Sequence, residues 1–330
     1  MSGEGDGDGD GELDEQGSEP DSAPRHLLVG REHKGLSVLD LLDGECGPID
    51  RSRVAAAARS GLILLNGEPI APTATIKAGD LVELKLAPTE LQRRRKGELR
   101  ILHEDETLVV ADKPSGMSFA EGRRGGESAL GLLGRHVTAL RPLHRLDKET
   151  SGVVVAARGG AAEETLQAEL AAGTAGVHYL AVLRGTLEES AGTIDVPLGK
   201  RRRSDTTLEP DPAHGTPCAT TWSVRETLRG FVLLDVAPLQ GGRSHQVRAH
   251  LSSAGMPVLC DRLYGEDDRL LLSQLKLDYR PKRGRPERPL LARPALHAER
   301  FVRGALEVRS PLPPDLDVLL AQLRRLRPLS

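Results

Sequence analysis

The 330-residue sequence predicts an α+β protein in which a mixed, mostly antiparallel sheet dominates a long C-terminal domain. Three observations lead to this prediction. Short apolar strands alternate irregularly with a few helical segments from residue 99 to about 309. A denser pattern of two helices, a hairpin and a further strand fills residues 32–88, and a polar, basic stretch at 89–98 indicates a linker. We therefore expect a small α+β domain at 32–88 and a long domain at 99–330.

The first segment, residues 1–31, consists mainly of Gly, Asp and Glu. It cannot bury enough apolar surface to offset the entropy lost on ordering, so we expect a disordered acidic tail. Residues 1–24 hold nine acids and no Lys or Arg, so the formal charge of −3 for the whole chain becomes +6 without them. The remainder is mildly basic, and its basic residues gather in clusters that attract phosphate backbones, at 93–96, 200–203, 280–288 and 324–325.

The composition argues against several classes of protein. Hydrophobic residues make up 38 % of the chain, but no apolar run approaches the roughly 18 residues of a membrane span. No secretory signal is evident at the N-terminus. Cys46, Cys218 and Cys260 are far apart and odd in number, so we expect buried thiols in a cytoplasmic protein rather than disulfides. Because aromatic residues are only 2 %, any RNA contact should rest on arginines, backbone amides and shape rather than base stacking.

The segment at 32–88 has clear local signals. Apolar residues at 39–42 and the stretch from Arg51 to Arg59 predict two short helices. The sequence GLILLNGEPI at 61–70 combines an apolar run, an Asn-Gly turn and a return strand, which is typical of a β-hairpin. A turn at 77–80 then leads into an alternating strand at 81–86.

The long domain begins with a strand at 108–111 that ends in a turn at 113–116. A helix at 161–172 is expected to stop at Gly173. Ser244 is a candidate N-cap for a helix that runs to Ser253. Further strands are expected at 152–157, 179–183 and 231–236, and a closing amphipathic helix at 316–326.

The stretch from Leu143 to Gly152 is dense in charge and precedes a buried strand, which can hold a side chain on a rigid support. Asp147 lies in it between Arg145 and Lys148. Nearby cations keep a carboxylate ionised, as a nucleophile or a base requires. From composition alone, a surface turn with a salt bridge explains the same residues.

The order of these residues favours a catalytic role. HRLDKETSG at 144–152 closely resembles the catalytic motif of the RluA family of RNA pseudouridine synthases. Other segments resemble further motifs of that family in the expected order, at 102–117, 177–185, 241–265 and 293–301. The pattern at 32–88 resembles the alpha-L RNA-binding domain shared with ribosomal protein S-four. The resemblance implies the pseudouridine synthase fold, with a central cleft, preceded by a small RNA-binding domain.

The resemblance also implies catalytic roles. Asp147 would attack the anomeric carbon of uridine or remove a ribose proton, so that the base detaches, rotates and rejoins through carbon 5; both routes stay open. Tyr179 would lie against the uracil, although the strand pattern alone favours a core residue at this position. Arg248 would pair with Asp147, because a partly buried carboxylate needs a partner to stay charged.

RNA contacts are implied for five arginines. Arg145 would occupy the space left by a nucleotide flipped out of its helix, since the glycosidic bond is inaccessible in a stacked duplex. Arg243, before the helix that ends at Ser253, would contact phosphate. The second helix of the small domain would present three further arginines to RNA, namely Arg51, Arg53 and Arg59.

Two departures from the family pattern concern Val177, where the family usually has Lys, and the segment 117–128, which lacks the usual His-Pro. We expect these to affect contacts rather than chemistry. His144, His245, His250 and His297 do not have the spacing of a zinc site, so no metal is predicted. Uridine isomerisation needs no redox chemistry, so no cofactor is implied.

The functional expectation is therefore a pseudouridine synthase that acts on structured RNA, with large-subunit ribosomal RNA favoured as partner. Monomer is the default, and neither the target uridine nor the role of the tail is determined. The alternatives are a tRNA-directed synthase and a non-catalytic RNA-binding or ribosome-assembly protein on the same fold. A hydrolase with a catalytic carboxylate would need a second acid or base, and nothing marks Glu149 as that partner.

Overall fold

A computed structural model describes residues 25–92, 98–122, 126–201, 207–239, 242–276, 278–280 and 286–329. Most of the predicted acidic tail, the basic cluster at 93–96 and parts of those at 200–203 and 280–288 lie outside these residues. The chain divides into two compact units, which meet in sequence between Arg93 and Arg94.

The first unit is a four-stranded antiparallel sheet, in the order β1-β4-β2-β3, with short helices. Ser37 and Asp40 form a capping box at the start of its first helix, and Asp50 caps the second. Asn66 (φ 52°) and Gly67 (φ 84°) turn the hairpin, as predicted from the Asn-Gly pair. The elements are β1 (Arg25–Leu28), η1 (Arg31–His33), α1 (Val38–Glu45), α2 (Arg51–Arg59), β2 (Ile63–Leu65), β3 (Glu68–Pro69), β4 (Leu81–Leu84) and α3 (Pro88–Leu91).

Two predicted boundaries of this unit are wrong. The disordered tail was expected to reach residue 31, but β1 pairs with β4 along its whole length. Val29, directly after β1, is buried, and this short apolar stretch supplies the surface that the acidic residues before it lack. The linker was expected to begin at residue 89, but Pro88 starts α3 and Leu91 is buried in the core. Because the residues around Leu91 are polar, the composition did not indicate that this one leucine is part of the core.

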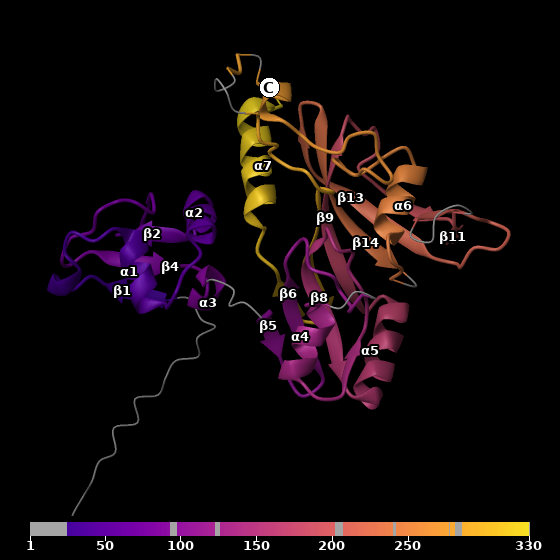
Figure 1. Ribbon diagram of the computed structural model, residues 1–330, viewed down its shortest axis with the longest axis horizontal. Coiled ribbons are helices and arrows are strands. Elements are labelled where there is room, and N and C mark those ends of the chain that lie inside the picture. Colours follow the sequence, from indigo (N-terminus) through magenta and orange to yellow (C-terminus); the bar gives the residue numbers. More distant parts are fainter. Residues whose placement is uncertain are drawn as a thin grey trace, which may run out of the picture. The chain divides into compact units, whose positions relative to one another are not determined.

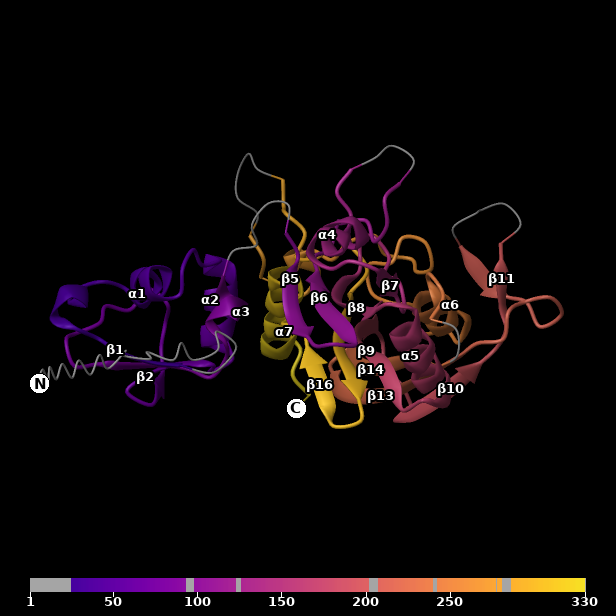
Figure 2. The same cartoon turned by 90° about the horizontal axis from the view of Figure 1, so that it is seen from below.

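The second unit contains a ten-stranded mixed sheet with the main order β10-β13-β14-β9-β15-β8-β6-β5. Among the strand pairs of the described residues, only β15 and β8 run parallel, which confirms the predicted fold class. A separate hairpin, β11–β12, projects from the sheet in both views (Figures 1 and 2). The strands are β5 (Arg100–Glu104), β6 (Leu108–Lys113), β7 (Leu140–Pro142), β8 (Ser151–Arg158), β9 (Ala175–Arg184), β10 (Ala191–Asp195), β11 (Leu198–Lys200), β12 (Leu208–Pro210), β13 (Ala219–Leu228), β14 (Phe231–Leu239), β15 (Leu296–Arg303) and β16 (Leu306–Arg309).

Helices cover the sheet, and the views in Figures 1 and 2 place α6 and α7 on opposite sides of its strands. Gly173 adopts the left-handed conformation that ends α5, as predicted. The closing helix α7 buries Leu316, Leu319, Leu320 and Leu323, which follow the helical repeat. The helices are α4 (Ala129–His136), α5 (Gly160–Ala172), α6 (Gln246–Ser253), η2 (Leu272–Gln274) and α7 (Pro314–Leu326).

The core of this unit lies at the central strands, where β6 is buried throughout and β8 nearly so. Continuous apolar runs of this kind are expected for strands covered on both faces. All three cysteines are buried and free, as predicted. In the part of the chain that the structure describes, no helix is long and apolar enough to cross a membrane.

The start of β8 fixes where the loop before it emerges from the sheet. Gly152 pairs with Ala298 of β15 in the parallel register and has a φ of 120°. A Cβ atom at Gly152 would lie 2.1 Å from the Ala298 carbonyl oxygen. Next to it, the Ser151 hydroxyl lies 3.0 Å from Nδ1 of His297, which is fully buried. Only glycine fits this approach of two backbones.

Gly152→Ala should therefore lower the free energy of unfolding by about 3 kcal/mol, because the methyl group forces the strands apart and strains the backbone. Urea denaturation measures the change. Gly160→Ala, in α5 with open space around its Cα, is the control and should change stability by less than about 1 kcal/mol. Equal effects of the two substitutions would contradict the close approach.

Candidate active site

The β7–β8 loop carries the predicted catalytic aspartate and is tied to β8 by hydrogen bonds. Leu143 donates its backbone N–H to Val155 O at 3.0 Å. The Val155 N–H in turn donates to Nε2 of His144 at 3.1 Å. Burial lowers the pKa of His144 to about 4, so its ring is neutral and remains an acceptor at neutral pH. The imidazole thus continues the strand pairing where β7 ends.

Lys113, at the end of β6, holds the same loop from another side. Its side chain is fully buried. The ammonium lies 2.9 Å from Met117 O, 3.1 Å from Pro114 O and 3.3 Å from Lys148 O. Since Lys148 follows Asp147, the turn after β6 and the catalytic loop share one buried cation. Burial lowers the pKa of Lys113 to about 7, against the opposing effect of the Asp147 charge.

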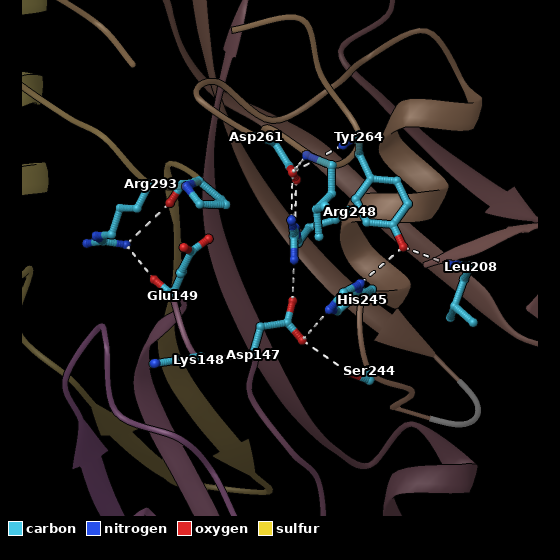
Figure 3. Close-up of polar contacts among 12 residues, drawn as sticks. Asp147, Lys148, Glu149, Leu208, Ser244, His245, Arg248, Asp261, Tyr264 and Arg293 are labelled. Carbon is cyan, nitrogen blue, oxygen red and sulfur yellow. Dashed lines mark hydrogen bonds and ion pairs between the residues drawn. The ribbon is translucent and has the colours of Figure 1, made fainter. Parts of the chain in front are cut away.

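Asp147 pairs with Arg248 of α6, as the sequence predicted (Figure 3). Nη1 of Arg248 lies 2.8 Å from Oδ2 of Asp147. The other side of the guanidinium binds Asp261 in a bidentate manner, with both distances 2.6 Å. Side-chain exposure is 11 % for Asp147, 3 % for Arg248 and 0 % for Asp261. Burial opposes the charge of Arg248, but the hydrogen bonds and charge of Asp261, supported by Asp147, outweigh it and raise its pKa.

The second oxygen of Asp147 faces Ser244 and His245. The Ser244 hydroxyl donates to Oδ1 at 3.2 Å, and Nε2 of His245 lies 3.5 Å from the same oxygen. Ser244 was predicted to cap the helix, which is wrong. His245 takes the left-handed conformation (φ 63°) as N-cap, so α6 begins at Gln246 and the Ser244 hydroxyl is directed to the carboxylate instead.

Tyr179 of β9 lines the same small pocket, which is also lined by Asp147 and Arg248. Burial, together with the Asp147 charge, raises the pKa of Tyr179, so its phenol is neutral at pH 7. Tyr179 also borders a larger hollow of about 1050 Å³, whose wall includes Val177 on the same face of β9. The three predicted catalytic side chains therefore converge on one pocket.

The predicted RNA-contacting arginines are divided between the two units. Arg145 is exposed and lines the pocket. Arg243 also lines it, but its guanidinium donates to the Leu198 carbonyl of β11 at 2.6 Å. Arg51 and Arg59 are exposed on α2 of the first unit, with Arg53 half-buried between them.

Several site residues had no role assigned from the sequence. Asp261, His245 and Tyr264 all lie within the matched segment 241–265, and Lys113 lies within 102–117. The sequence does contain a signal for Asp261 and Lys113. A charged residue that lies within a family motif but has no catalytic role is a candidate partner for a catalytic residue. Their burial, 0 % exposed in both cases, is visible only in the structure. Within the described ranges, no cluster of His, Cys, Asp and Glu could hold a metal ion.

Comparisons with known proteins agree with this geometry. The sequence profile of the family "RNA pseudouridylate synthase" matches residues 107–253. Ribosomal large subunit pseudouridine synthase D of Xanthomonas campestris is 32 % identical, over 94 % of this chain and 96 % of that protein. Ribosomal large subunit pseudouridine synthase C of Pasteurella multocida is 28 % identical, over 92 % and 94 %. Human RNA pseudouridylate synthase domain containing 4 superposes with a TM-score of 0.54 at 25 % identity, over 68 % of this chain and 93 % of that one.

The fold and the pocket are thus those of an RNA-modifying isomerase. The chain belongs to the RluA family of RNA pseudouridine synthases, and it converts uridine to pseudouridine in RNA.

The Arg248–Asp261 pair should be the most sensitive electrostatic contact of the site. Asp261→Ala leaves a buried guanidinium with a single carboxylate partner, so we expect the free energy of unfolding to fall by about 3–5 kcal/mol. Chemical denaturation measures this. Asp268→Ala breaks an exposed pair with Arg269, with distances of 2.6 and 2.8 Å, and should leave the free energy of unfolding nearly unchanged. A small loss for Asp261→Ala would show that Asp147 alone satisfies Arg248.

Lys113 should make stability depend on pH. Its pKa is about 7 when folded and about 10.4 when unfolded, so between these values the unfolded chain binds more protons. The free energy of unfolding should therefore rise with pH above 7, by up to about 1.4 kcal/mol per pH unit from this group. Lys113→Met removes the ammonium and is the reference. The stability difference between wild type and variant should be constant below pH 7 and should shift in favour of wild type from pH 7 to 9. A constant difference up to pH 9 would show that Lys113 stays charged.

Proposed function

We propose that this enzyme isomerises uridines of large-subunit ribosomal RNA, with Asp147 as its catalytic carboxylate. The observation that carries the proposal is the pairing of Asp147 with Arg248 inside a pocket that Tyr179 also lines. A carboxylate that is 11 % exposed stays ionised when a buried guanidinium at 2.8 Å compensates for lost hydration. An ionised carboxylate in a pocket is the group that either proposed route of the reaction requires.

The reaction needs no external reactant. The bond between N1 of uracil and C1′ breaks, a bond between C5 and C1′ forms, C5 loses a proton and N1 gains one. Asp147 acts first, either by attacking C1′ or by removing a proton from the ribose. Tyr179, a neutral phenol, lies against the detached uracil while it rotates. Arg248 holds the carboxylate in place throughout, because its bidentate bond to Asp261 fixes the guanidinium while Nη1 donates to Asp147.

RNA must present the uridine outside its helix, since the glycosidic bond is otherwise out of reach. Arg145, exposed at the pocket, would fill the vacated space in the RNA. Arg243 would add positive charge near the phosphates. The first unit, with Arg51 and Arg59 exposed on α2, would act as a separate RNA grip of the ribosomal protein S-four type.

The names of the relatives support the choice of ribosomal RNA. Ribosomal large subunit pseudouridine synthases D and C align over more than 90 % of this chain, and therefore over both units. This favours ribosomal RNA over tRNA and an enzyme over a non-catalytic binding protein. We further propose that the enzyme acts in the cytoplasm as a monomer.

Asp147→Asn should abolish pseudouridine formation, with a loss of at least about 1,000-fold, because the amide can neither attack carbon nor accept a proton. RNA affinity should change little, since the amide keeps the shape. Pseudouridine mapping of ribosomal RNA, in a deletion strain complemented with each variant, measures the product and identifies the target. Asp268→Asn, at an exposed surface pair, is the matched control and should complement fully.

Residual isomerisation by Asp147→Asn above that level would refute the assigned role. If the wild-type gene restored pseudouridine in tRNA only, the substrate would be tRNA and not ribosomal RNA. Release of free uracil would indicate a hydrolase.

A further inference from the structure

Tyr264, outside the wall of the pocket that holds Asp147, contacts two of that residue's partners, His245 and Arg248. We propose that Tyr264 is a positioning residue: its hydroxyl fixes the tautomer of His245, so that His245 presents an N–H to Asp147, and it connects that carboxylate to the β11–β12 hairpin. The proposal rests on the catalytic role proposed above for Asp147.

The hydrogen bonds determine which nitrogen carries the proton. Leu208 donates its backbone N–H to the Tyr264 oxygen at 2.8 Å, so that oxygen already accepts one bond. Nδ1 of His245 lies 3.2 Å from the same oxygen and, among the described residues, is the one recorded acceptor for the hydroxyl proton. A neutral imidazole that accepts at Nδ1 carries its proton on Nε2. Figure 3 shows this chain from Leu208 through Tyr264 and His245 to Asp147.

The other end of the imidazole requires the same tautomer. Nε2 lies 3.5 Å from Oδ1 of Asp147, and an ionised carboxylate only accepts hydrogen bonds. The opposite tautomer would place two lone pairs face to face. Burial lowers the pKa of His245, which outweighs the raising effect of Asp147 and keeps the ring neutral at pH 7. The distance from Nε2 to Oδ1 is longer than that of a strong hydrogen bond. The orientation of the His245 N–H toward Asp147 therefore matters more than the energy of that contact.

Tyr264 itself is held firmly. Its ring stands edge-on to His245, with centroids 5.7 Å apart and an angle of 84° between the planes. The Arg248 guanidinium carbon lies 5.1 Å from the centroid of the same ring. The Tyr264 backbone N–H donates to Asp261 at 3.2 Å, and its carbonyl accepts from Ser252 at 2.7 Å. The Tyr264 side chain thus contacts both His245 and Arg248, the two residues that face Asp147 with ring or guanidinium nitrogens.

The chain also reaches the projecting hairpin. Leu208 belongs to β12, and Arg243, just before α6, donates to Leu198 of β11 at 2.6 Å. Both strands of the hairpin are therefore bonded to residues beside the pocket. The described part of the hairpin ends in Lys200 and Arg201, which are exposed and suited to phosphate. A displacement of β12 by bound RNA would change the Leu208–Tyr264 bond and hence the support of His245.

Tyr264→Phe tests the proposal, because it keeps the ring and its contact with Arg248 but removes the hydroxyl. We expect kcat to fall about tenfold, with KM for the RNA unchanged, since a single oriented hydrogen bond is lost. His245→Gln places an amide N–H where Nε2 was and needs no tyrosine, so it should lose less activity than His245→Ala, which leaves no N–H there. Tyr279→Phe, which removes a hydroxyl elsewhere, is the control and should behave as wild type.

The combination of variants separates an indirect role from a direct one. If Tyr264 acts through His245, then Tyr264→Phe should cause no further loss of kcat in a His245→Ala or a His245→Gln background. Multiplicative losses would overturn the proposal, because they would show that Tyr264 acts by another path. An unchanged kcat for Tyr264→Phe alone would overturn it too.

Nitrogen NMR of the imidazole decides the tautomer without any turnover. In the free wild-type enzyme, the His245 ring should show a protonated Nε2 and an unprotonated Nδ1; in Tyr264→Phe, the two tautomers should mix. A protonated Nδ1 in wild type would refute the proposal even if Tyr264→Phe failed to fold. The NMR measurement of the tautomer does not depend on activity. If Asp147 proved not to be catalytic, the tautomer result would still stand, so the two proposals can fail separately.

Discussion

The site depends on one guanidinium shared by two carboxylates. Arg248 is 3 % exposed, and a charge so deeply buried is tolerated only when opposite charges compensate for its lost hydration. Asp261 accepts hydrogen bonds from Nε and Nη2, and Nη1 donates to Asp147, 101 residues earlier in the chain. The bidentate pair fixes the plane of the guanidinium, so the position of Asp147 follows from it. Three separate segments, the β7–β8 loop, α6 and the turn after α6, are held together by this arrangement.

The sheet supplies the second constraint, because the loop that carries Asp147 is attached to it on each side. His144 continues the pairing with β8 through its ring, and Gly152 approaches β15 too closely for any other residue. Lys113 places a buried ammonium against the carbonyl of Lys148. These contacts use backbone groups and side chains that take no part in the proposed chemistry. They leave the loop few ways to move, which is what a reaction that detaches and reattaches a base requires.

Where the prediction from sequence failed, a local rule was overruled by a contact from elsewhere. Ser244 has the position of a helix cap, yet its hydroxyl bonds Asp147, because His245 turns the chain before α6 begins. Residues 25–28 follow an acidic segment and were predicted to continue it, yet they pair with β4 as a strand. Leu91 occurs in a polar stretch, but the core of the first unit buries it. In each case the partner is distant in sequence, so no local pattern could reveal it.

The sequence by itself determined the α+β class and many of the helices and central strands, since apolar periodicity is a property of the chain alone. Its resemblance to a known family predicted that Asp147, Tyr179 and Arg248 share one site. The tertiary structure decided how these residues are supported. Asp261 and Lys113 are charged and fully buried, and burial depends on which strands and turns cover a side chain. The link from Leu208 through Tyr264 and His245 to Asp147 joins segments that only folding brings within hydrogen-bonding distance.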